Sequence, residues 1–464
     1  MKITITNLGV FKFAEYELAD LTIICGKNNC GKTYATYALY GFFDFFQLGY
    51  RLKVKESDIK ELINKGSLLM PLDTSIDKFN QYLLEACQEF KRYLPKIFAA
   101  QPNSFKDSDI KIQVSQADIC ILSHYEKQYK TNKKDYLLQI VKEENDNNLK
   151  ISLVSDDPSY LNNVSFVDSL RNIIGDVVKK ILFSNLFPEC YIASTERTGA
   201  VTFKEELNFE RNSILKEVVS QEKFDIKSIF DKMYDIAYPL PVRRNIDFVR
   251  NLYSISKDES ELSKNYPEII KRFNEITGGS YKVQKEGLFY IPKSSKSKLS
   301  INESASSVRS LLDIYFYLNC IARPGHLLMI DEPEMNLHPE SQRNFARVIA
   351  RLVNAGIKVY VTTHSDYFIK ELNTLLMLNS KFDKSEKIAS IMSEYNYSKE
   401  ELLRYEQVKL FIAKKSSILI EGNARRTLCH TLVKANVSES GMIADSFDDT
   451  IKEMNTLQQS LFFV

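Results

Sequence analysis

Neither sign of charge is in excess in this sequence of 464 residues, where 62 Lys and Arg stand against 60 Asp and Glu. The formal net charge of +2 gives no global case for a nucleic-acid or membrane partner, although a local basic groove is left open. No apolar run approaches the roughly 18 residues needed to span a bilayer, and the N-terminal segment has no signal-peptide core. Internal repeats and low-complexity segments are also missing. The lack of a membrane-spanning run and of a signal peptide predicts a soluble cytoplasmic protein, and the hydrophobic fraction of 44% suffices for a large core.

The sequence also lacks paired cysteines. Its seven cysteines are odd in number and show no CxxC spacing, which fits neither a disulfide framework nor a zinc site. We therefore predict thiols in a reducing compartment at Cys25, Cys30, Cys87, Cys120, Cys190, Cys320 and Cys429.

What the sequence does contain is a set of short apolar strands separated by helical patterns. One compact strand at residues 21–25 runs directly into glycine, and the succession of strand, loop and helix predicts an α/β fold. Other segments interrupt this pattern and are interpreted as additions to it. The predicted domains are a sheet domain of residues 1–40, 184–202 and 278–378, an α+β insertion of residues 41–183, a helical insertion of residues 203–277, and a C-terminal helical region for docking a partner at residues 379–464.

Residues 26–33, GKNNCGKT, match the phosphate-binding pattern GxxxxGK[ST] at every fixed position, after an apolar strand and before a helical pattern. The glycines allow a tight loop whose N–H groups cradle phosphates, Lys32 reaches the β- and γ-phosphates, and the Thr33 hydroxyl ligates Mg²⁺. A chance glycine-rich turn is the alternative, which the flanking strand and helix disfavour. The sequence therefore predicts a site for ATP and Mg²⁺, with the candidate nucleotide-binding residues Gly26, Lys27, Asn28, Asn29, Cys30, Gly31, Lys32, Thr33 and Tyr34.

A second motif, residues 326–334 with the sequence HLLMIDEPE, is an apolar strand that ends in two carboxylates, as Walker B strands do. Asp331 is predicted to hold Mg²⁺ with Thr33, and Glu332 to orient and deprotonate the attacking water. The alternative is an acidic pair that only stabilises a helix N-terminus. The P-loop earlier in the chain favours the catalytic interpretation.

A third motif follows the strand predicted at residues 358–362. A histidine at the carboxyl end of a sheet strand, beside a nucleotide crevice, can reach a γ-phosphate, so His364 is a candidate catalytic sensor or switch. Taken alone, the motif is equally well explained as a polar residue near a helix cap made by Ser365 or Asp366.

In this order and at this separation, GKNNCGKT, LLMIDEPEMNLHP and VYVTTHSD resemble the ABC-type ATPases of the RecF/SMC/OLD group. Within that group, YIASTERTG, SASSVRSLLDIYFYL and NLHPE resemble the stand-alone bacterial AAA-type ATPases of anti-phage defence operons, including the Septu ATPase. The resemblance covers residues 1–40 and 190–375. It implies an ABC-type P-loop ATPase head with a mixed sheet flanked by helices, carrying helical and β insertions.

The resemblance also implies a composite ATP site between at least two copies of the chain. Ser306 and Ser307 would occupy the signature position, where one subunit meets the ATP of another. This sequence departs from the family pattern there, because LSGGQ is absent and hydroxyls and Arg309 stand in place of two glycines. Residues 336–338 would form the D-loop that crosses the dimer interface.

Two further positions are left open between a functional and a structural interpretation. Glu196 and Arg197 follow the strand after which related enzymes place a lid-coupling glutamine, but a salt-bridged turn explains them equally well. Phe11 or Phe13 could stack on adenine or pack in the core.

A strand pattern at residues 416–422 resembles the first strand and glutamate of a Toprim nuclease, but no paired-aspartate strand follows it. We therefore expect no nuclease activity in this chain and a separately encoded effector protein, most simply a nuclease. The resemblance implies a homo-oligomeric ATPase that senses or regulates this effector in anti-phage defence. The alternatives are a RecF-like DNA-maintenance ATPase, which would contact DNA, and a scaffold that binds ATP and hydrolyses it slowly.

Overall fold

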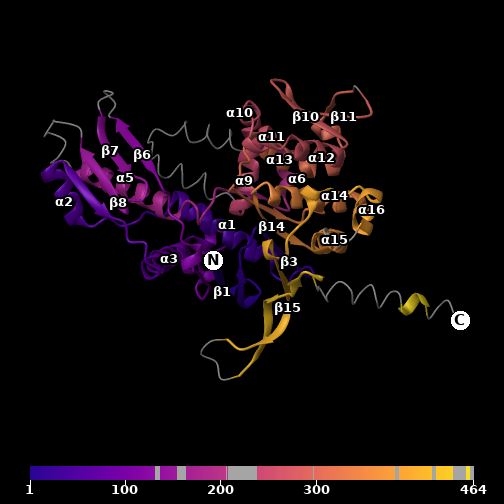
Figure 1. The fold of residues 1–464 in the computed structure, drawn as a ribbon, viewed down its shortest axis with the longest axis horizontal. Coiled ribbons are helices and arrows are strands. Elements are labelled where there is room, and N and C mark those ends of the chain that lie inside the picture. Colours follow the sequence, from indigo (N-terminus) through magenta and orange to yellow (C-terminus); the bar gives the residue numbers. More distant parts are fainter. Residues whose placement is uncertain are drawn as a thin grey trace. The chain divides into compact units, whose positions relative to one another are not determined.

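The computed structural model describes residues 1–130, 136–153, 164–204, 206, 238–295, 297–381, 386–420, 425–442 and 456–459. Glu421, which resembles the Toprim glutamate, lies outside these residues. No helix in the described ranges is long and apolar enough to cross a membrane. None of the seven cysteines, all of which are described, forms a disulfide. The chain divides into two compact units (Figure 1): unit 1 is Met1–Lys2, Phe42–Phe90 and Lys111–Pro188, and unit 2 is Ile3–Gly41, Lys91–Ile110 and Glu189–Val464.

Unit 1 contains an antiparallel sheet in the order β4-β8-β7-β6. Alternate residues of β8, Leu149 and Ile151, are fully buried, so one face of the sheet packs on a core. The interior of the unit also contains a cluster of phenylalanine rings, among them Phe42, Phe46 and Phe187. The elements are β4 (Ser67–Pro71), β6 (Tyr125–Lys130), β7 (Tyr136–Lys142), β8 (Asn148–Leu153), α2 (Glu56–Lys65), α3 (Ile76–Phe90) and α5 (Val164–Phe183).

The principal sheet is centred in unit 2 and has nine strands in the order β5-β1-β2-β16-β15-β3-β14-β13-β9. Neighbours from β15 to β9 are parallel, whereas β15 and β16 are antiparallel. Every residue of β3 and β13 is buried, as expected for strands covered on both faces. The strands are β1 (Lys2–Leu8), β2 (Phe11–Glu17), β3 (Leu21–Cys25), β5 (Asp109–Gln113), β9 (Cys190–Ala193), β13 (Leu327–Asp331), β14 (Lys358–Thr363), β15 (Val408–Ile418) and β16 (Thr427–Lys434).

Helices of unit 2 pack on one another around this sheet. α11, α12 and α13 lie side by side, and α12 also contacts α14, which packs against α15 (Figure 1). A second, three-stranded sheet has the order β10-β11-β12. The elements are α1 (Lys32–Leu48), which begins in unit 2, α6 (Arg197–Thr202), α9 (Leu240–Arg250), α10 (Leu252–Ile255), α11 (Glu261–Asn265), α12 (Pro267–Thr277), α13 (Ser306–Cys320), α14 (Pro339–Asn354), α15 (Asp366–Lys381), α16 (Glu386–Glu394), β10 (Gly279–Gln284), β11 (Gly287–Pro292) and β12 (Leu299–Ser300).

The register of the parallel strands brings several strand ends to one edge of the sheet. Thr363 pairs with Cys25, and Thr362 with Asp331. The loop after β3, the acidic turn after β13 and the turn after β14 therefore open on the same edge, where open α/β sheets bind ligands. The predicted α/β fold, with a mixed sheet flanked by helices, is confirmed.

The C-terminal segment differs from the helical region predicted for residues 379–464. It contains α16, but β15 and β16 are strands that enter the principal sheet between β3 and β2. β15 pairs in parallel with β3, from Val408 beside Leu21 to Ile412 beside Cys25. Its apolar run VKLFIA is a strand covered on both faces, so it lacks the alternation that marks a half-exposed strand. The prediction of a helical region is wrong for these residues.

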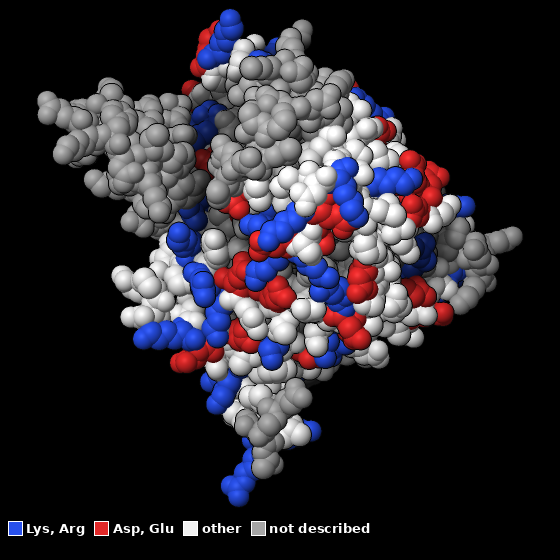
Figure 2. Space-filling view, turned by 90° about the vertical axis from the view of Figure 1, so that its left-hand side faces the viewer, with Lys and Arg blue, Asp and Glu red and all other residues white. Residues whose placement is uncertain are grey.

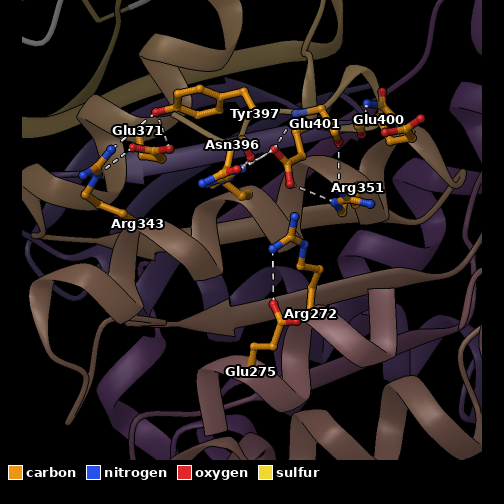
Figure 3. A network of polar contacts seen from close by, with 12 residues as sticks. Arg272, Glu275, Arg343, Arg351, Glu371, Asn396, Tyr397, Glu400 and Glu401 are labelled. Atoms are coloured by element: carbon orange, nitrogen blue, oxygen red, sulfur yellow. Dashed lines mark hydrogen bonds and ion pairs between the residues drawn. The ribbon is translucent and has the colours of Figure 1, made fainter. Parts of the chain in front are cut away.

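A network of ion pairs holds α14 to the segment that follows α16 (Figure 3). Glu401, whose side chain is 1% exposed, pairs with Arg347 at 2.8 Å and with Arg351 at 3.0 Å, both on α14. Tyr397 of the same segment donates its hydroxyl to Glu371 of α15 at 2.9 Å. Both carboxylates are buried, so the network fixes this segment against two helices that cover the sheet.

Glu401→Gln is expected to lower the free energy of unfolding by about 3 kcal/mol, because it leaves two guanidinium groups without their buried anion. Urea unfolding followed by circular dichroism measures this change. Glu275→Gln is the matched control, since the Arg272–Glu275 pair in the same region has side chains 41% and 40% exposed. Such exposed pairs contribute about 0–1 kcal/mol. Equal destabilisation by the two changes would contradict the anchoring role.

Candidate active site

The loop between β3 and α1 leaves no room for side chains at its two glycines. Gly26 has a φ of +149° and Gly31 a φ of +96°, which L-residues rarely adopt. A Cβ at Gly26 would lie 2.5 Å from the carbonyl oxygen of Ala413, and one at Gly31 would lie 2.7 Å from the ring of Phe11. Both glycines are therefore needed for this path of the chain. Phe11 is 1% exposed and supports the loop from the core, so it offers no open face to a base.

Lys32 begins α1 and lies inside this loop. It is 6% exposed, and its Nζ donates to the carbonyl oxygens of Gly26 at 2.9 Å and Lys27 at 3.0 Å. Thr33, the next residue, is exposed at the mouth of the loop. An ammonium group among backbone groups at a helix N-terminus is an arrangement that binds phosphate oxygens.

The other predicted loop residues divide between solvent and packing. Residues 27–29 are exposed and Cys30 is half-buried. Tyr34 packs against Phe98, with ring centroids 5.2 Å apart, and against Gly9, where a Cβ would lie 2.5 Å from its ring. The side chain of Tyr34 is thus engaged in packing, and its contribution to a ligand would come from its backbone.

The end of β13 meets the start of α1 at Asp331 and Thr33. The Thr33 hydroxyl donates to Asp331 Oδ2 at 3.2 Å, and the Thr362 hydroxyl donates to Asp331 Oδ1. Asp331 is 1% exposed, and burial raises the pKa of its carboxyl group to about 6. Glu196, bonded to Tyr37 of α1 at 2.9 Å, adds to this rise through its charge. A hydroxyl beside a buried carboxylate fits Mg²⁺, which takes one or two protein oxygens and completes its shell with phosphate and water.

Glu332 has a left-handed backbone with a φ of +54°. This conformation is uncommon for a residue other than glycine and costs about 1–3 kcal/mol. Four hydrogen bonds hold it. The Glu332 N–H donates to the carbonyl of Thr362 at 3.0 Å and to its hydroxyl at 3.3 Å, and the Glu332 carbonyl accepts from Arg197 at 2.9 Å and from the Met335 N–H at 3.2 Å. Such over-determined strain concentrates at functional sites, which supports the choice of Glu332 as a candidate.

His364 lies between two glutamates at the end of β14. Its Nδ1 is 3.3 Å from Glu332 Oε1 and 3.2 Å from Glu334 Oε1. The hydrogen bond between His364 and Glu332 lowers the pKa of the glutamate and raises the pKa of the histidine. Glu334 also accepts from the His364 N–H at 2.7 Å, which fixes the position of the turn. Ser365 caps α15 by accepting from the N–H of Phe368 at 3.1 Å, so the cap and the histidine contact are separate features.

Arg197 belongs to the same site, although its local sequence did not indicate the groups that it bonds. It is 1% exposed and donates to four backbone carbonyls at 2.8 to 2.9 Å. Its partners are carbonyl groups rather than the carboxylate of a salt-bridged turn. Those carbonyls belong to Ser194, Ser310, Asp331 and Glu332.

The remaining predicted residues lie at exposed or half-buried positions. Ser306 and Ser307 begin α13, the first exposed and the second half-buried. Within the described ranges, neither serine is hydrogen-bonded to the P-loop or to Asp331 and Glu332 at the end of β13. Asn336 and His338 are exposed at the predicted D-loop, and His338 Nδ1 accepts from the Glu340 N–H at the start of α14.

A family profile described as an AAA ATPase domain matches residues 1–369, which contain the P-loop, the acidic strand end and His364. The chain belongs to this AAA ATPase family. Among solved structures it is similar to an SMC head bound to the C-winged helix domain of ScpA, with 10% identity, a TM-score of 0.34, and coverage of 93% of this chain and 97% of that one. It is also similar to the SMC head domain from Thermotoga maritima, with 9% identity, a TM-score of 0.28, and coverage of 94% and 98%. No curated protein matches the chain.

The AAA ATPase domain therefore carries a coherent set of groups at one edge of its sheet. They are an ammonium group in a backbone cradle, a hydroxyl and buried carboxylate that fit a magnesium ion, and an ionised carboxylate beside a histidine. Together they can bind a phosphate, hold a cation and accept a proton from water. The residues are Lys32, Thr33, Asp331, Glu332 and His364.

Proposed function

We propose that this chain binds ATP with Mg²⁺ and hydrolyses it at the edge formed by the P-loop, Asp331 and Glu332. The observation that carries the proposal is the approach of Thr33 to Asp331, at 3.2 Å, beside a loop that encloses Lys32. The loop N–H groups and Lys32 bind the phosphates, and Thr33 and Asp331 hold the metal. Bound Mg²⁺ supplies charge that offsets the negative charge developing on the transferred phosphoryl group.

Glu332 is the general base in this proposal. Its lowered pKa keeps it ionised at neutral pH, so a carboxylate oxygen is available to orient water and accept its proton. His364 restrains that carboxylate and, with a side chain 45% exposed on the same edge, can also contact the γ-phosphate. The hydrogen bonds of the Glu332 backbone fix the position of this residue, and they do not involve its carboxylate.

A second copy of the chain would complete the site. In the described residues, the N-terminus of α13 has no side-chain cap, and Ser306 there is exposed. Uncapped N–H groups at a helix N-terminus favour an anion. The signature position implied by the resemblance would therefore bring Ser306 and Ser307 of one protomer to the γ-phosphate held by its partner.

The biological role that we propose is control of a separately encoded effector, most simply a nuclease, in anti-phage defence. Its support is the resemblance of YIASTERTG, SASSVRSLLDIYFYL and NLHPE to the stand-alone ATPases of such operons. A RecF-like role would call for a continuous basic groove. On the face drawn in Figure 2, Lys and Arg are interspersed with Asp and Glu, which gives the DNA-binding alternative no support there.

ATP with Mg²⁺ is expected to dimerise the Glu332→Gln protein, because ATP that is bound but not hydrolysed holds two composite sites closed. Size exclusion with light scattering should show the 53.6 kDa mass of one chain rising about twofold on ATP addition. Lys32→Ala is the control and should show no ATP-dependent change. A mass of Glu332→Gln that is the same with and without ATP would overturn the composite site.

A further inference from the structure

Arg197 forms hydrogen bonds to three elements of the chain. In the proposed composite site, the end of β13 acts on the ATP bound by the same protomer, and the start of α13 contacts the ATP of the partner. Its Nη1 donates to the carbonyl of Ser194 at the end of β9 and to that of Asp331 at the end of β13, both at 2.8 Å. Its Nη2 donates to the carbonyl of Glu332 at 2.9 Å. Its Nε donates to the carbonyl of Ser310 in α13 at 2.8 Å. One guanidinium group thus bonds both the end of β13, which carries Asp331 and Glu332, and α13, which begins at Ser306.

The bond to Glu332 is the one with a direct consequence for chemistry. The carbonyl of Glu332 is fixed by Arg197, while its N–H is fixed by Thr362 at 3.0 Å. These two contacts hold the left-handed conformation from both sides of the residue. Because that conformation is strained, loosening one contact allows the backbone to relax and moves the carboxylate.

A second bond joins α13 to the same segment. The hydroxyl of Ser310 lies 3.2 Å from the carbonyl of Met335 and 2.9 Å from that of Ser307, and it can donate to either. The Met335 N–H in turn donates to the carbonyl of Glu332 at 3.2 Å. The first turns of α13 are therefore connected to the turn after β13 through Arg197 and through Ser310.

We infer that Arg197 is a positioning residue that couples the two ATP sites of a dimer. The inference rests on the proposed composite site, in which each protomer supplies Glu332 to one ATP and the start of α13 to the other. A protomer whose α13 engages its partner's γ-phosphate then transmits that contact, through the Arg197 carbonyl bonds, to the Glu332 of its own site. ATP binding at one site thereby orders the base at the second.

The expected result is a loss of turnover and of cooperativity without a matching loss of ATP affinity. Arg197→Lys keeps the charge but has one nitrogen in place of the planar fork, so it cannot reach carbonyls on three elements at once. We expect kcat to fall by about 100-fold, as for a displacement of about 1 Å at a catalytic group. KM for ATP should stay within about twofold, since the P-loop is untouched, and the Hill coefficient should fall to unity.

Arg351→Lys is the matched control. Arg351 is another buried arginine of the same unit, 7% exposed, and it bonds Glu401 and Ser398 away from the P-loop edge. It should lower the melting temperature as Arg197→Lys does while leaving kcat and the Hill coefficient unchanged. If Arg197→Lys does not fold, Ser310→Ala replaces it, because that change removes only the hydroxyl contact and should still lower the Hill coefficient.

The measurements on the wild type and on the variants test the composite site and the Arg197 coupling separately. A wild-type Hill coefficient of unity, with a rate per subunit independent of protein concentration, removes the composite site and the coupling with it. If the wild type is cooperative and Arg197→Lys is equally cooperative, the coupling is overturned and the composite site still stands. Where the lysine variant does not fold, an equally cooperative Ser310→Ala has the same consequence. Loss of cooperativity in Arg197→Lys but not in Arg351→Lys supports the coupling.

Discussion

Lys32→Ala is expected to weaken ATP binding by at least about 100-fold, because it removes roughly 3 kcal/mol of charge-assisted hydrogen bonding to phosphate oxygens. The ammonium group is enclosed by the loop and bonded to the carbonyls of Gly26 and Lys27. It therefore lies where phosphates would enter the backbone cradle. Turnover should be lost together with binding, since Lys32 is the positively charged side chain that the loop encloses, whereas Lys27 of the same loop is exposed.

The affinity is measured by titration with a fluorescent ATP analogue in the presence of Mg²⁺. Lys27→Ala is the matched control, because Lys27 belongs to the same loop but has an exposed side chain. It should bind the analogue within a few-fold of wild type, on the order of 1 kcal/mol or less for an exposed charge. If Lys27→Ala and Lys32→Ala weaken binding equally, the loop attracts phosphate only by its general charge and Lys32 has no special position.

The parts of this site that could be predicted from the sequence are those that follow from local pattern and strand order. Residues 21–25 are apolar and run into the glycine of the P-loop, and the structure has β3 at these residues. β13 likewise ends at Asp331, and β14 ends one residue before His364. Because parallel strands present their carboxyl ends at one edge, these three motifs were expected to meet.

The contacts of Arg197 could not be predicted, because its partners have no sequence signature. Arg197 lies 113 residues before Ser310 and 134 before Asp331, and it bonds their backbone carbonyls. Every residue has such a carbonyl, so no pattern of side chains in the sequence predicts which carbonyls Arg197 bonds. The left-handed conformation of Glu332 was hidden for a similar reason, since tertiary bonds impose it on a residue that rarely adopts it.

The strand pattern predicted at residues 416–422 overlaps only the end of β15. The earlier part of β15 was missed because short apolar runs do not distinguish a buried strand from a helix by their period. Its pairing partner is also remote in sequence, with Val408 beside Leu21. Only the tertiary fold places this strand next to β3, where Ala413 limits the space at Gly26. A segment assigned to a partner-docking tail thus helps to shape the P-loop.

Glu332→Gln is expected to keep ATP binding and to lower turnover by about 1000-fold, within the range of roughly 10²–10⁴ that a positioned general base contributes. Glutamine has the same length and can still bond His364, but its amide does not accept a proton. The backbone bonds to Thr362 and Arg197 do not involve the side chain, so the strained turn should persist. The loss of turnover then measures the contribution of the general base rather than a change in the fold.

Turnover is measured as phosphate release under saturating ATP, and retained binding by the analogue titration used for Lys32→Ala. Glu340→Gln is the matched control, because Glu340 is an exposed carboxylate in the first turn of α14, close in sequence but without a contact to His364 in the described structure. Equal rates for wild type and Glu332→Gln would place the base elsewhere. Glu334, whose Oε1 lies 3.2 Å from His364 Nδ1 on the same edge, would then be the carboxylate to replace next.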